Sequence, residues 1–384
     1  MKKYEIKVEG EESAGGSNFL VRKSRIKSEN KSTFSVTKAF PYDEFTLDKN
    51  QYYINEAFMR GTDQDLIEMY KNKSKSEDFI RLVKTKVRSK KFNIPFLDIN
   101  WTGQISDERF EKVAGIITDT IYGNTNIDLI NPPKLSFPNS IDEHKRFDYY
   151  ISFLKILGSV MRDTFGENRM SCFIPEYFSF HHIENLINFY VENNGADGLF
   201  VVDNDGKTFT SKYANAFFVM RTLRRLHKSE GFALYCYNTK ASKRSGNAVP
   251  SEDFLAFYNG FSFVGQSHRG VILPKKIRDE LQTKLTKLIY RDDLLYYPYN
   301  KSANDGPYKD LESWRSIFSK ETKVTNSVLK KYNAVVTDNV LKNFREDPNS
   351  VLMSLKRHQF SEELAKLGKA RDSVMNNKPL NDFL

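Results

Sequence analysis

Short apolar segments alternate with longer amphipathic segments along most of this sequence. The short segments are rich in β-branched and aromatic residues and end in turn or polar residues, which is typical of buried β-strands. We expect eight strands, at Phe34–Phe40, Tyr52–Phe58, Asn93–Ile99, Ile127–Asn131, Met170–Tyr177, Gly198–Asp203, Phe232–Asn238 and Phe261–Gln266. Helical stretches lie between them, at Asp63–Ser89, Ser106–Tyr122, Ser140–Phe165, His181–Asn193, Ser211–Ser229 and Ser251–Tyr258.

Eight strands separated mostly by helices predict an α/β protein with a parallel sheet, and eight is the number that closes a (β/α)8 TIM-type barrel. A doubly wound open sheet is the competing arrangement. We favour the barrel because the strands are short and evenly spaced, and because neither Gly-x-Gly-x-x-Gly nor Gly-x-x-x-x-Gly-Lys follows any of them. The sequence therefore predicts a short N-terminal β cap over residues 1–32, a barrel over 33–300 and a C-terminal helical extension over 301–384.

Two details of the later sequence add to this prediction. Ile277–Ile289 has the pattern of a helix that closes the barrel, and Leu294–Tyr299 that of an extended segment. The helices expected after residue 319 carry many lysine and arginine residues. They are either a solvated appendage or a surface for a protein partner.

Composition narrows the class of protein. The 384 residues include 39% hydrophobic residues, enough for a large core, and no window approaches the roughly 18 apolar residues of a membrane-spanning helix. Cys172 and Cys236 both lie in strand-like runs, so neither a disulfide framework nor a cysteine zinc site is expected. We therefore expect a soluble, cytoplasmic protein without membrane contact, metal or cofactor. The net charge of +10 favours DNA or RNA as a partner.

Polar residues stand at the ends of the predicted strands, where the active site of a barrel enzyme is built. If the barrel is formed, they surround one cavity, and Asp98, Glu176 and Asp203 are the candidate catalytic carboxyl groups. Asp98 is the best candidate for an acid, base or nucleophile because it ends an apolar strand. The polar set at these ends is Lys38, Asn55, Glu56, Asp98, Asn100, Asn131, Glu176, Asp203, Asn204, Asp205, Asn238, Lys240, Gln266, His268 and Arg269.

Substrate-binding and nucleic-acid-binding residues are expected around the same rim. The loop at 240–247 is basic and contains a glycine, so its cations can neutralise phosphates, although a solvated loop is the alternative. The segment Asp203–Gly206 resembles part of a calcium loop, but Lys212 stands where that loop requires a glutamate, so a tight turn is favoured. Candidate substrate contacts are Asn100, Trp101, Tyr177 and Asn238. Candidate phosphate contacts are Lys240, Lys243, Arg244, His268 and Arg269.

Two stretches resemble the tRNA-guanine transglycosylase superfamily, including its DNA-acting relatives that insert 7-deazaguanine bases. Ile94–Gly103 (IPFLDINWTG) is similar to the segment in which that family's third strand ends in an aspartate, and Val249–Phe261 (VPSEDFLAFYNGF) is similar to its late helix-to-strand unit. The resemblance covers about two thirds of the chain. It implies a barrel that exchanges a base in tRNA or DNA, with Asp98 at the position of the family's first aspartate.

Two departures from that family keep other functions open. Phe261–Gln266 contains no acid where the family has its nucleophile, and the family's zinc site of three cysteines and one histidine is missing. One alternative is a catalytically inactive barrel that serves as a nucleic-acid-binding or assembly subunit. The other is a small-molecule barrel enzyme that acts on a phosphorylated or glycosidic substrate, with Asp98, Glu176 and Asp203 as acid and base.

Overall fold

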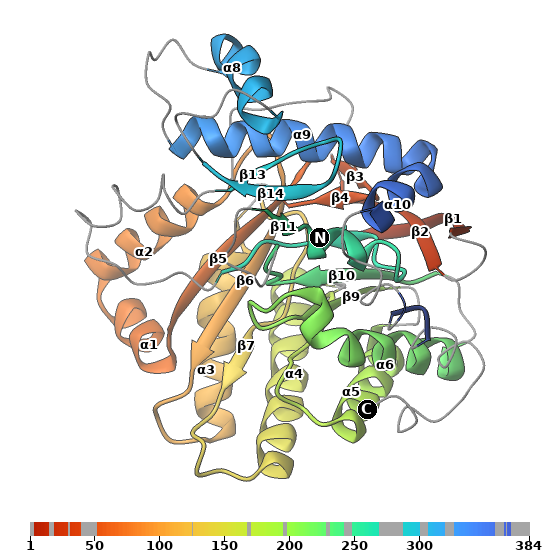
Figure 1. The fold of residues 1–384 in the computed structure, drawn as a ribbon. Coiled ribbons are helices and arrows are strands. Elements are labelled where there is room, and N and C mark those ends of the chain that lie inside the picture. Colours follow the sequence, from red (N-terminus) through yellow and green to blue (C-terminus); the bar gives the residue numbers. More distant parts are fainter. Residues whose placement is uncertain are drawn as a thin grey trace.

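A computed structural model of the chain describes residues 4–14, 19–29, 31–39, 52–124, 126–166, 170–194, 198–227, 231–241, 248–268, 287–299, 306–318, 326–357, 365 and 367–369. Within these ranges helices alternate with parallel strands along most of the chain (Figure 1). The protein is therefore of the α/β class, as the sequence predicts. Within the same ranges, no helix combines the length and the apolar character that crossing a membrane requires.

The parallel strands form two sheets. In the first sheet β5, β6 and β7 are neighbours in this order, and in the second the order is β4-β12-β10-β9-β8. A parallel bridge between Ile130 and Met170 joins the segment before β7 to the segment before β8. No ladder between described residues joins β4 to β5. The bounds are β4 (Thr37–Lys38), β5 (Ile54–Thr62), β6 (Phe92–Asn100), β7 (Lys134–Ser136), β8 (Cys172–Ile174), β9 (Leu199–Asp203), β10 (Ala233–Tyr237) and β12 (Phe263–Val264).

One apolar cluster receives side chains from both parallel sheets. Leu199 and Val201 of β9 belong to it, as do Ile54 of β5, Ile94 of β6 and Phe263 of β12. Successive side chains of a strand point to opposite faces, and the alternate residues of β9 and β10 belong instead to the larger cluster beneath the helices. Both faces of β9 and β10 are therefore buried, which explains why these two strands are almost entirely apolar.

The helices follow the parallel strands, and local sequence signals set their ends. Asn72 accepts a hydrogen bond from the backbone N–H of Lys75, which starts a new helix and divides the single helix predicted at 63–89. Ser106 and Asp142 cap later helices in the same way. The bounds are α1 (Asp63–Lys71), α2 (Lys73–Lys86), α3 (Asp107–Ile117), a π-helical turn (Thr118–Tyr122), α4 (Glu143–Phe165), α5 (Phe180–Asn194), α6 (Phe209–His227) and a 3-10 turn (Glu252–Ala256).

One predicted strand lies later in the chain than expected. Residues 127–131 contribute only the bridge at Ile130, and the continuous pairing with β6 begins at Lys134, which is the register partner of Asp98. Pro132 and Pro133 separate the two places, and proline has no N–H to give to a ladder. The shift brings Lys134 to the end of the parallel sheet.

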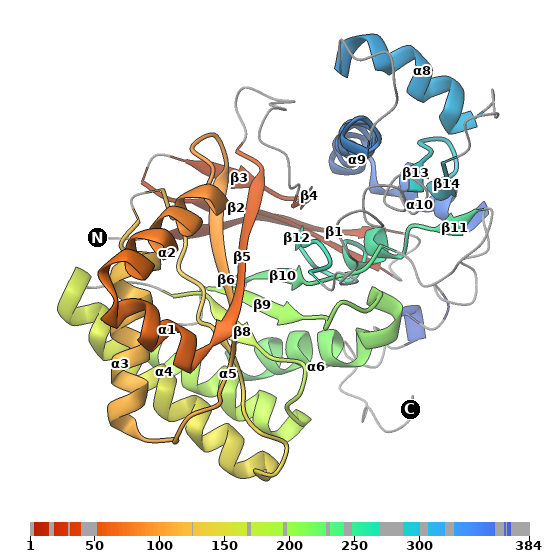
Figure 2. The ribbon, with the colours of Figure 1, turned by 90° about the vertical axis from the view of Figure 1, so that its left-hand side faces the viewer.

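The remaining strands and helices lie at the two ends of the sequence. Figure 2 shows α8, α9, β13 and β14 together on one side of the parallel strands. Of the helix predicted at 277–289, only residues 287–289 are described, and they form a strand; the extended segment predicted at 294–299 is confirmed. The bounds are β1 (Glu5–Ala14), β2 (Phe19–Lys27) and β3 (Ser32–Phe34) in one antiparallel sheet, β11 (Val249–Pro250), β13 (Lys287–Ile289) and β14 (Leu295–Pro298) in another, and α8 (Gly306–Phe318), α9 (Asn326–Glu346) and α10 (Pro348–Arg357).

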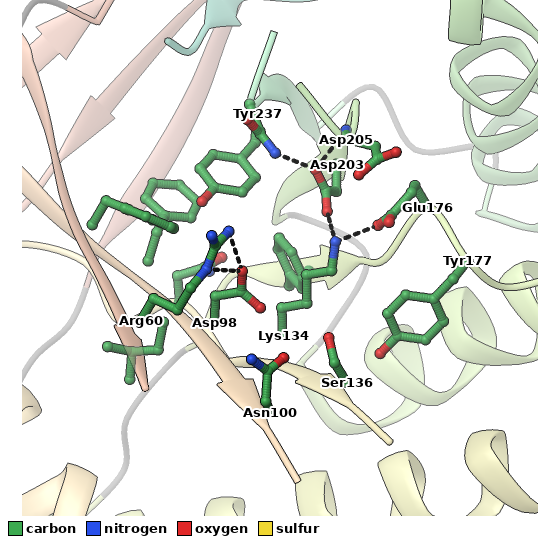
Figure 3. A pocket seen from close by; sticks show the side chains of 16 residues that line it. Arg60, Asp98, Asn100, Lys134, Ser136, Glu176, Tyr177, Asp203, Asp205 and Tyr237 are labelled. Atoms are coloured by element: carbon green, nitrogen blue, oxygen red, sulfur yellow. Dashed lines mark hydrogen bonds and ion pairs between the residues drawn. The ribbon is translucent and has the colours of Figure 1, made fainter. Parts of the chain in front are cut away.

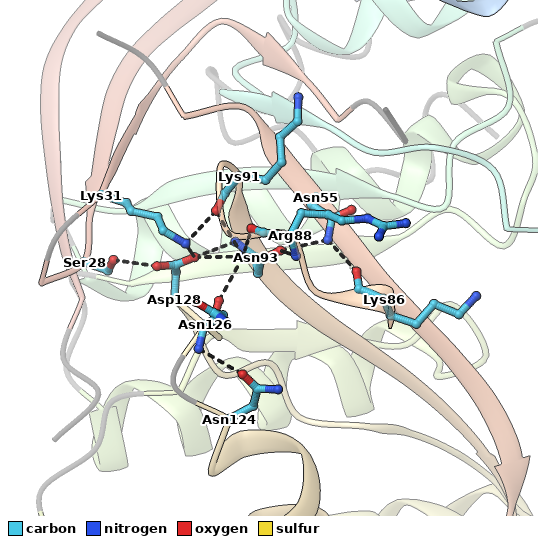
Figure 4. A network of polar contacts seen from close by, with 10 residues as sticks. All are labelled: Ser28, Lys31, Asn55, Lys86, Arg88, Lys91, Asn93, Asn124, Asn126 and Asp128. Carbon is cyan, nitrogen blue, oxygen red and sulfur yellow. Dashed lines mark hydrogen bonds and ion pairs between the residues drawn. The ribbon is translucent and has the colours of Figure 1, made fainter. Parts of the chain in front are cut away.

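A network of polar contacts connects the N-terminal sheet to the N-terminal ends of β5 and β6 (Figure 4). The buried amide of Asn93 donates to the backbone oxygens of Arg88, Lys91 and Asn126, at 2.8, 3.0 and 2.9 Å, and its Oδ1 accepts from Asn55 Nδ2 at 2.8 Å. Asp128, whose Oδ2 accepts from Lys31 Nζ at 3.0 Å, joins this network to the residues that precede β3. These bonds satisfy polar groups that burial would otherwise leave without partners.

Replacing Asn93 with alanine should lower the free energy of unfolding by about 3 kcal/mol, because several buried donors and acceptors lose their partner together. Urea denaturation of the wild type and N93A measures the change. N126A is the matched control, since the exposed Asn126 enters the network only through its backbone atoms. Equal stability of N93A and N126A would contradict this account of the network.

Candidate active site

The carboxyl ends of β5 to β10 surround a cavity of about 360 Å³ (Figure 3). Asp98, Glu176, Asp203 and Asn238 are far apart in the sequence, and all four line it, which is the geometry predicted for the end of the parallel strands. Asn100 and Tyr177 also line it. The complete lining is Phe58, Arg60, Phe96, Leu97, Asp98, Asn100, Asn131, Lys134, Ser136, Phe173, Glu176, Tyr177, Asp203, Asp205, Tyr237 and Asn238.

Lys134 joins two acidic side chains on one wall of this cavity. Its Nζ lies 2.7 Å from Glu176 Oε2 and 2.8 Å from Asp203 Oδ2. The Asp203 side chain is fully buried, and those of Lys134 and Glu176 are 15% and 12% exposed. Three ionisable groups from β7, the residues after β8 and the end of β9 therefore meet in a place with little water.

Burial and mutual charge divide the three groups into different protonation states. Burial, together with the negative charge of Asp203 and a hydrogen bond to it, raises the pKa of Glu176 to about 8. Burial alone would raise the pKa of Asp203, but the Lys134 ammonium holds it below its usual value. Burial alone would lower the pKa of Lys134, but the carboxylates of Asp203 and Glu176 raise it. Near neutral pH the cluster holds an ammonium, a carboxylate and a carboxylic acid.

Asp203 is held in place from its other side. Its Oδ1 accepts from the backbone N–H of Asp205 at 2.9 Å and from Asn238 Nδ2 at 3.4 Å. Asp205 and Asn238 have φ angles of 55° and 54°, in the left-handed region that Asp and Asn tolerate better than most residues. The backbone N–H of Lys207 donates to the oxygen of Asn204 at 2.9 Å, so this segment is the tight turn that the sequence predicts.

Asp98 has a different environment. It pairs with Arg60, whose NH2 group lies 2.7 Å from Asp98 Oδ2, and its side chain is 15% exposed while that of Arg60 is 54% exposed. In Figure 3 this pair lies on the other side of Lys134 from Glu176. The carboxylate is thus close to the buried cluster and already bound to a cation. A role for Asp98 as acid, base or nucleophile stays a prediction.

Aromatic rings form the apolar part of the cavity wall. Tyr237 stacks on Phe96 with ring centroids 3.9 Å apart and an angle of 5° between the rings, and Phe58 also faces the cavity. The hydroxyl of Tyr177 donates to the backbone oxygen of Leu135, which fixes the ring beside Lys134. The cavity therefore combines an apolar wall with hydrogen-bonding groups, as small-molecule sites commonly do.

A carboxylate occupies the end of the last parallel strand, although Phe261–Gln266 contains no acid. Glu56 of β5 reaches there: its Oε2 accepts from the backbone N–H of Gln266 at 2.9 Å and contacts His268 Nε2 at 2.8 Å, and its Oε1 accepts from Tyr235. A Cβ on Gly265 would lie 2.3 Å from Glu56 Oε1, so a larger residue there would displace the Glu56 carboxyl group from these partners. His268, which the sequence predicts to face a phosphate, directs its Nε2 at Glu56 and stacks its ring on Phe58, and its role in nucleic-acid binding stays a prediction.

Other predicted binding residues do not line the cavity. Trp101, expected at the rim, is only 2% exposed and packs edge-on against Phe110 at 4.9 Å, so its ring cannot stack on a ligand. It follows the end of β6 but turns into the apolar layer between the sheet and α3. Lys240 is exposed and lies outside the cavity lining. Lys243, Arg244 and Arg269 lie outside the described residues.

Two cationic residues of the site, Lys134 and Arg60, are not among those that the sequence predicts. Lys134 is the only charged residue in Ile130–Phe137, but it follows the expected strand by three positions because the prolines delay the ladder. Arg60 lies beyond the predicted end of the second strand, and β5 in fact continues to Thr62. A charged residue isolated within an apolar stretch was the one available signal for Lys134.

Comparison with known proteins does not assign the chain to a family: no protein-family model matches the sequence, and no curated protein matches it. An activity therefore has to be inferred from the residues of the site.

The raised pKa of Glu176 predicts how stability depends on pH. Between pH 4.5, the ordinary pKa, and about pH 8, the folded protein keeps a proton that the unfolded chain has lost. Raising the pH through this window should therefore lower the free energy of unfolding. The lowered pKa of Asp203 acts at more acidic pH and does not offset this trend. Denaturation curves at several pH values should show a weaker decline for E176Q than for the wild type.

E108Q controls for the loss of one carboxyl group, because Glu108 lies exposed on α3. The same decline in wild type, E108Q and E176Q would show that Glu176 does not hold the extra proton.

Proposed function

We propose that this protein is an enzyme that breaks and re-forms the bond between a base and its sugar in DNA or RNA. The observation that carries the proposal is the cluster of Lys134, Glu176 and Asp203, which places a carboxylic acid beside a carboxylate in one cavity. Cleavage of a glycosidic bond with retention needs this pair, with carboxyl groups roughly 5–5.5 Å apart. Here both carboxyl groups bind Lys134 Nζ and also share a hydrogen bond, so the two groups lie closer than this and must move apart to admit a sugar between them.

We propose a (β/α)8 barrel as the scaffold, closed between β4 and β5. Three observations support closure: eight parallel strands in two sheets, the Ile130–Met170 bridge between these sheets, and an apolar cluster that both sheets share. Glu56 of β5 bonds to Gln266 just beyond β12, so the first strand of one sheet reaches the other sheet. The cavity then takes the place at the carboxyl ends of the strands where barrel enzymes act.

In the proposed reaction Asp203 is the nucleophile and Glu176 is the acid and base. The Asp203 carboxylate attacks C1′ of the sugar, the electrons of the C1′–N bond pass to the leaving base, and Glu176 donates its proton to that base. A glycosyl ester on Asp203 results. An incoming 7-deazaguanine-type base then gives a proton to Glu176 and attacks C1′, which releases Asp203. Lys134 keeps Asp203 ionised before the attack and binds both carboxyl groups throughout.

The remaining lining residues suit a nucleoside. Phe58, Phe96 and Tyr237 line the cavity with apolar surface that the edge of a base can contact, while Asp98 and Asn100 offer hydrogen-bonding groups. Asp98 is also the residue at which the sequence resembles the transglycosylase superfamily. The net charge of +10 favours the nucleic acid over a free nucleoside. We place this activity in the cytoplasm and propose α8 to α10 as the surface for a protein partner.

An inactive nucleic-acid-binding subunit is the second candidate function. The observation in its favour is the end of β12, where the resembling family has its nucleophile and this chain has Gly265 and Gln266. Under this alternative the cavity would bind a base without breaking the bond to its sugar.

Transfer of labelled 7-deazaguanine into tRNA or DNA tests the choice. The wild type should incorporate the label, E176Q should be at least about 100-fold slower because it cannot transfer the proton, and D203N should be inactive. Mass spectrometry should find a glycosyl adduct on the wild type and none on D203N. E108Q is the control. Absence of incorporation and of adduct with the wild type, at intact nucleic-acid affinity, would favour the binding subunit.

A further inference from the structure

A second hollow adjoins the candidate active site. Its volume is about 560 Å³, and it lies between β5, α1 and α2. Phe58 and Arg60 line both this groove and the catalytic cavity, so the two hollows share a wall. The lining of the groove is Phe58, Met59, Arg60, Met69, Lys75, Asp78, Phe79, Leu82 and Lys86.

The groove combines an apolar floor with a basic rim. Leu82 is 47% exposed, one of three large hydrophobic side chains that are strongly exposed among the described residues. Lys75 and Lys86 are exposed, and neither forms an ion pair with another described residue. Asp78, the acidic residue of the lining, pairs with Arg81 at 3.3 Å. The groove therefore presents uncompensated positive charge beside an apolar surface. Exposure of that surface to water is unfavourable in free energy.

The spacing along α2 makes this surface a continuous stripe. Lys75, Phe79, Leu82 and Lys86 follow one another at intervals of four, three and four residues, which places them on one face of the helix. The two lysines lie about three turns, or roughly 16 Å, apart along the helix axis. A ligand that engages both must be extended.

We propose that this groove binds the single-stranded nucleotides that adjoin the nucleotide whose base enters the catalytic cavity. The inference rests on the proposed function and deepens it by naming a second binding site for the same polymer. A base lies against the exposed Leu82, and phosphates contact Lys75 and Lys86. Arg60, on the shared wall, contacts the phosphate that links the two hollows. The proposal takes the strand to be single here because a base that lies against Leu82 must itself have left its stack.

The charges of the groove favour this ligand over an apolar or acidic partner protein. Nucleic acid offers a flat apolar face and an anionic group in each repeating unit, and the groove offers an apolar floor with cations at both ends. The groove and the cavity share Phe58 and Arg60, so a polymer whose base occupies the cavity can continue directly into the groove.

Fluorescence anisotropy with labelled single-stranded DNA and RNA of about ten nucleotides tests the proposal, since single-strand sites commonly span roughly 4–16 nucleotides. K75A/K86A should weaken binding at least about 10-fold and reduce the slope of log K against log salt by roughly 1.4, or about 0.7 for each phosphate that no longer meets a lysine. L82A should weaken binding without changing the slope.

K73A/K84A is the matched control. Lys73 and Lys84 are also exposed lysines of α2 with the same spacing, and they lie two residues before Lys75 and Lys86, on the opposite face of the helix. This pair removes the same charge and should change the affinity little. Equal losses of affinity in K75A/K86A and K73A/K84A would show a general effect of charge. That result would overturn the proposal that the groove binds nucleotides. An unchanged affinity of K75A/K86A, or no binding by the wild type, would also overturn it.

The outcome is separable from that of the proposed reaction. The protein could bind oligonucleotides through Lys75 and Lys86 and yet never exchange a base. That result would support nucleotide binding in the groove and refute the proposed reaction. Base exchange with a KM that K75A/K86A leaves unchanged supports the reaction and refutes the groove. Circular dichroism melts of all variants check that each remains folded.

Discussion

The parallel alignment of the strands is the constraint on which the candidate active site depends. Because neighbouring strands run in one direction, their carboxyl ends meet at one edge, and residues separated by more than 100 positions become neighbours there. The register then decides which side chains meet. Asp98 is level with Lys134, and Asp203 is level with Tyr237, so acids, cations and aromatic rings are interleaved around one cavity. A shift of one residue would turn each of these side chains to the helical layer.

Within that cavity the number of buried charges determines the chemistry. Two carboxyl groups share one ammonium, and leaving a second carboxylate without its own cation in a buried place is costly. The cluster meets this cost by keeping a proton on Glu176, which is more exposed than Asp203, whose carboxylate also accepts a backbone hydrogen bond. The different surroundings of two chemically similar groups thus separate their pKa values, as in enzymes that use paired carboxyl groups.

The sequence was most informative where its signals were local. Alternation of apolar segments identified the strands, and the polar residue at each strand end identified Asp98, Glu176 and Asp203, which do line one cavity. It was less informative where tertiary packing decides. Trp101 directly follows Asn100, the last residue of β6, and continues the alternation that turns Ile99 toward the helices, so its ring enters the core although its position beside a strand end suggested the rim. The carboxylate of Glu56 beside Gly265 comes from a distant strand, so no inspection of the last strand could reveal it.

The ion pair of Arg60 and Asp98 lies where the two hollows meet. Arg60 is bound to Asp98 while its side chain remains half exposed toward the groove. In the proposed arrangement a phosphate that contacts Arg60 competes with Asp98 for the same guanidinium, since both are anions that this group binds through paired hydrogen bonds. Asp98 then becomes free to accept a hydrogen bond from the edge of the base. Binding of the backbone in the groove thereby prepares the cavity for the base, while the buried cluster of Lys134, Glu176 and Asp203 stays separated from the phosphate charge.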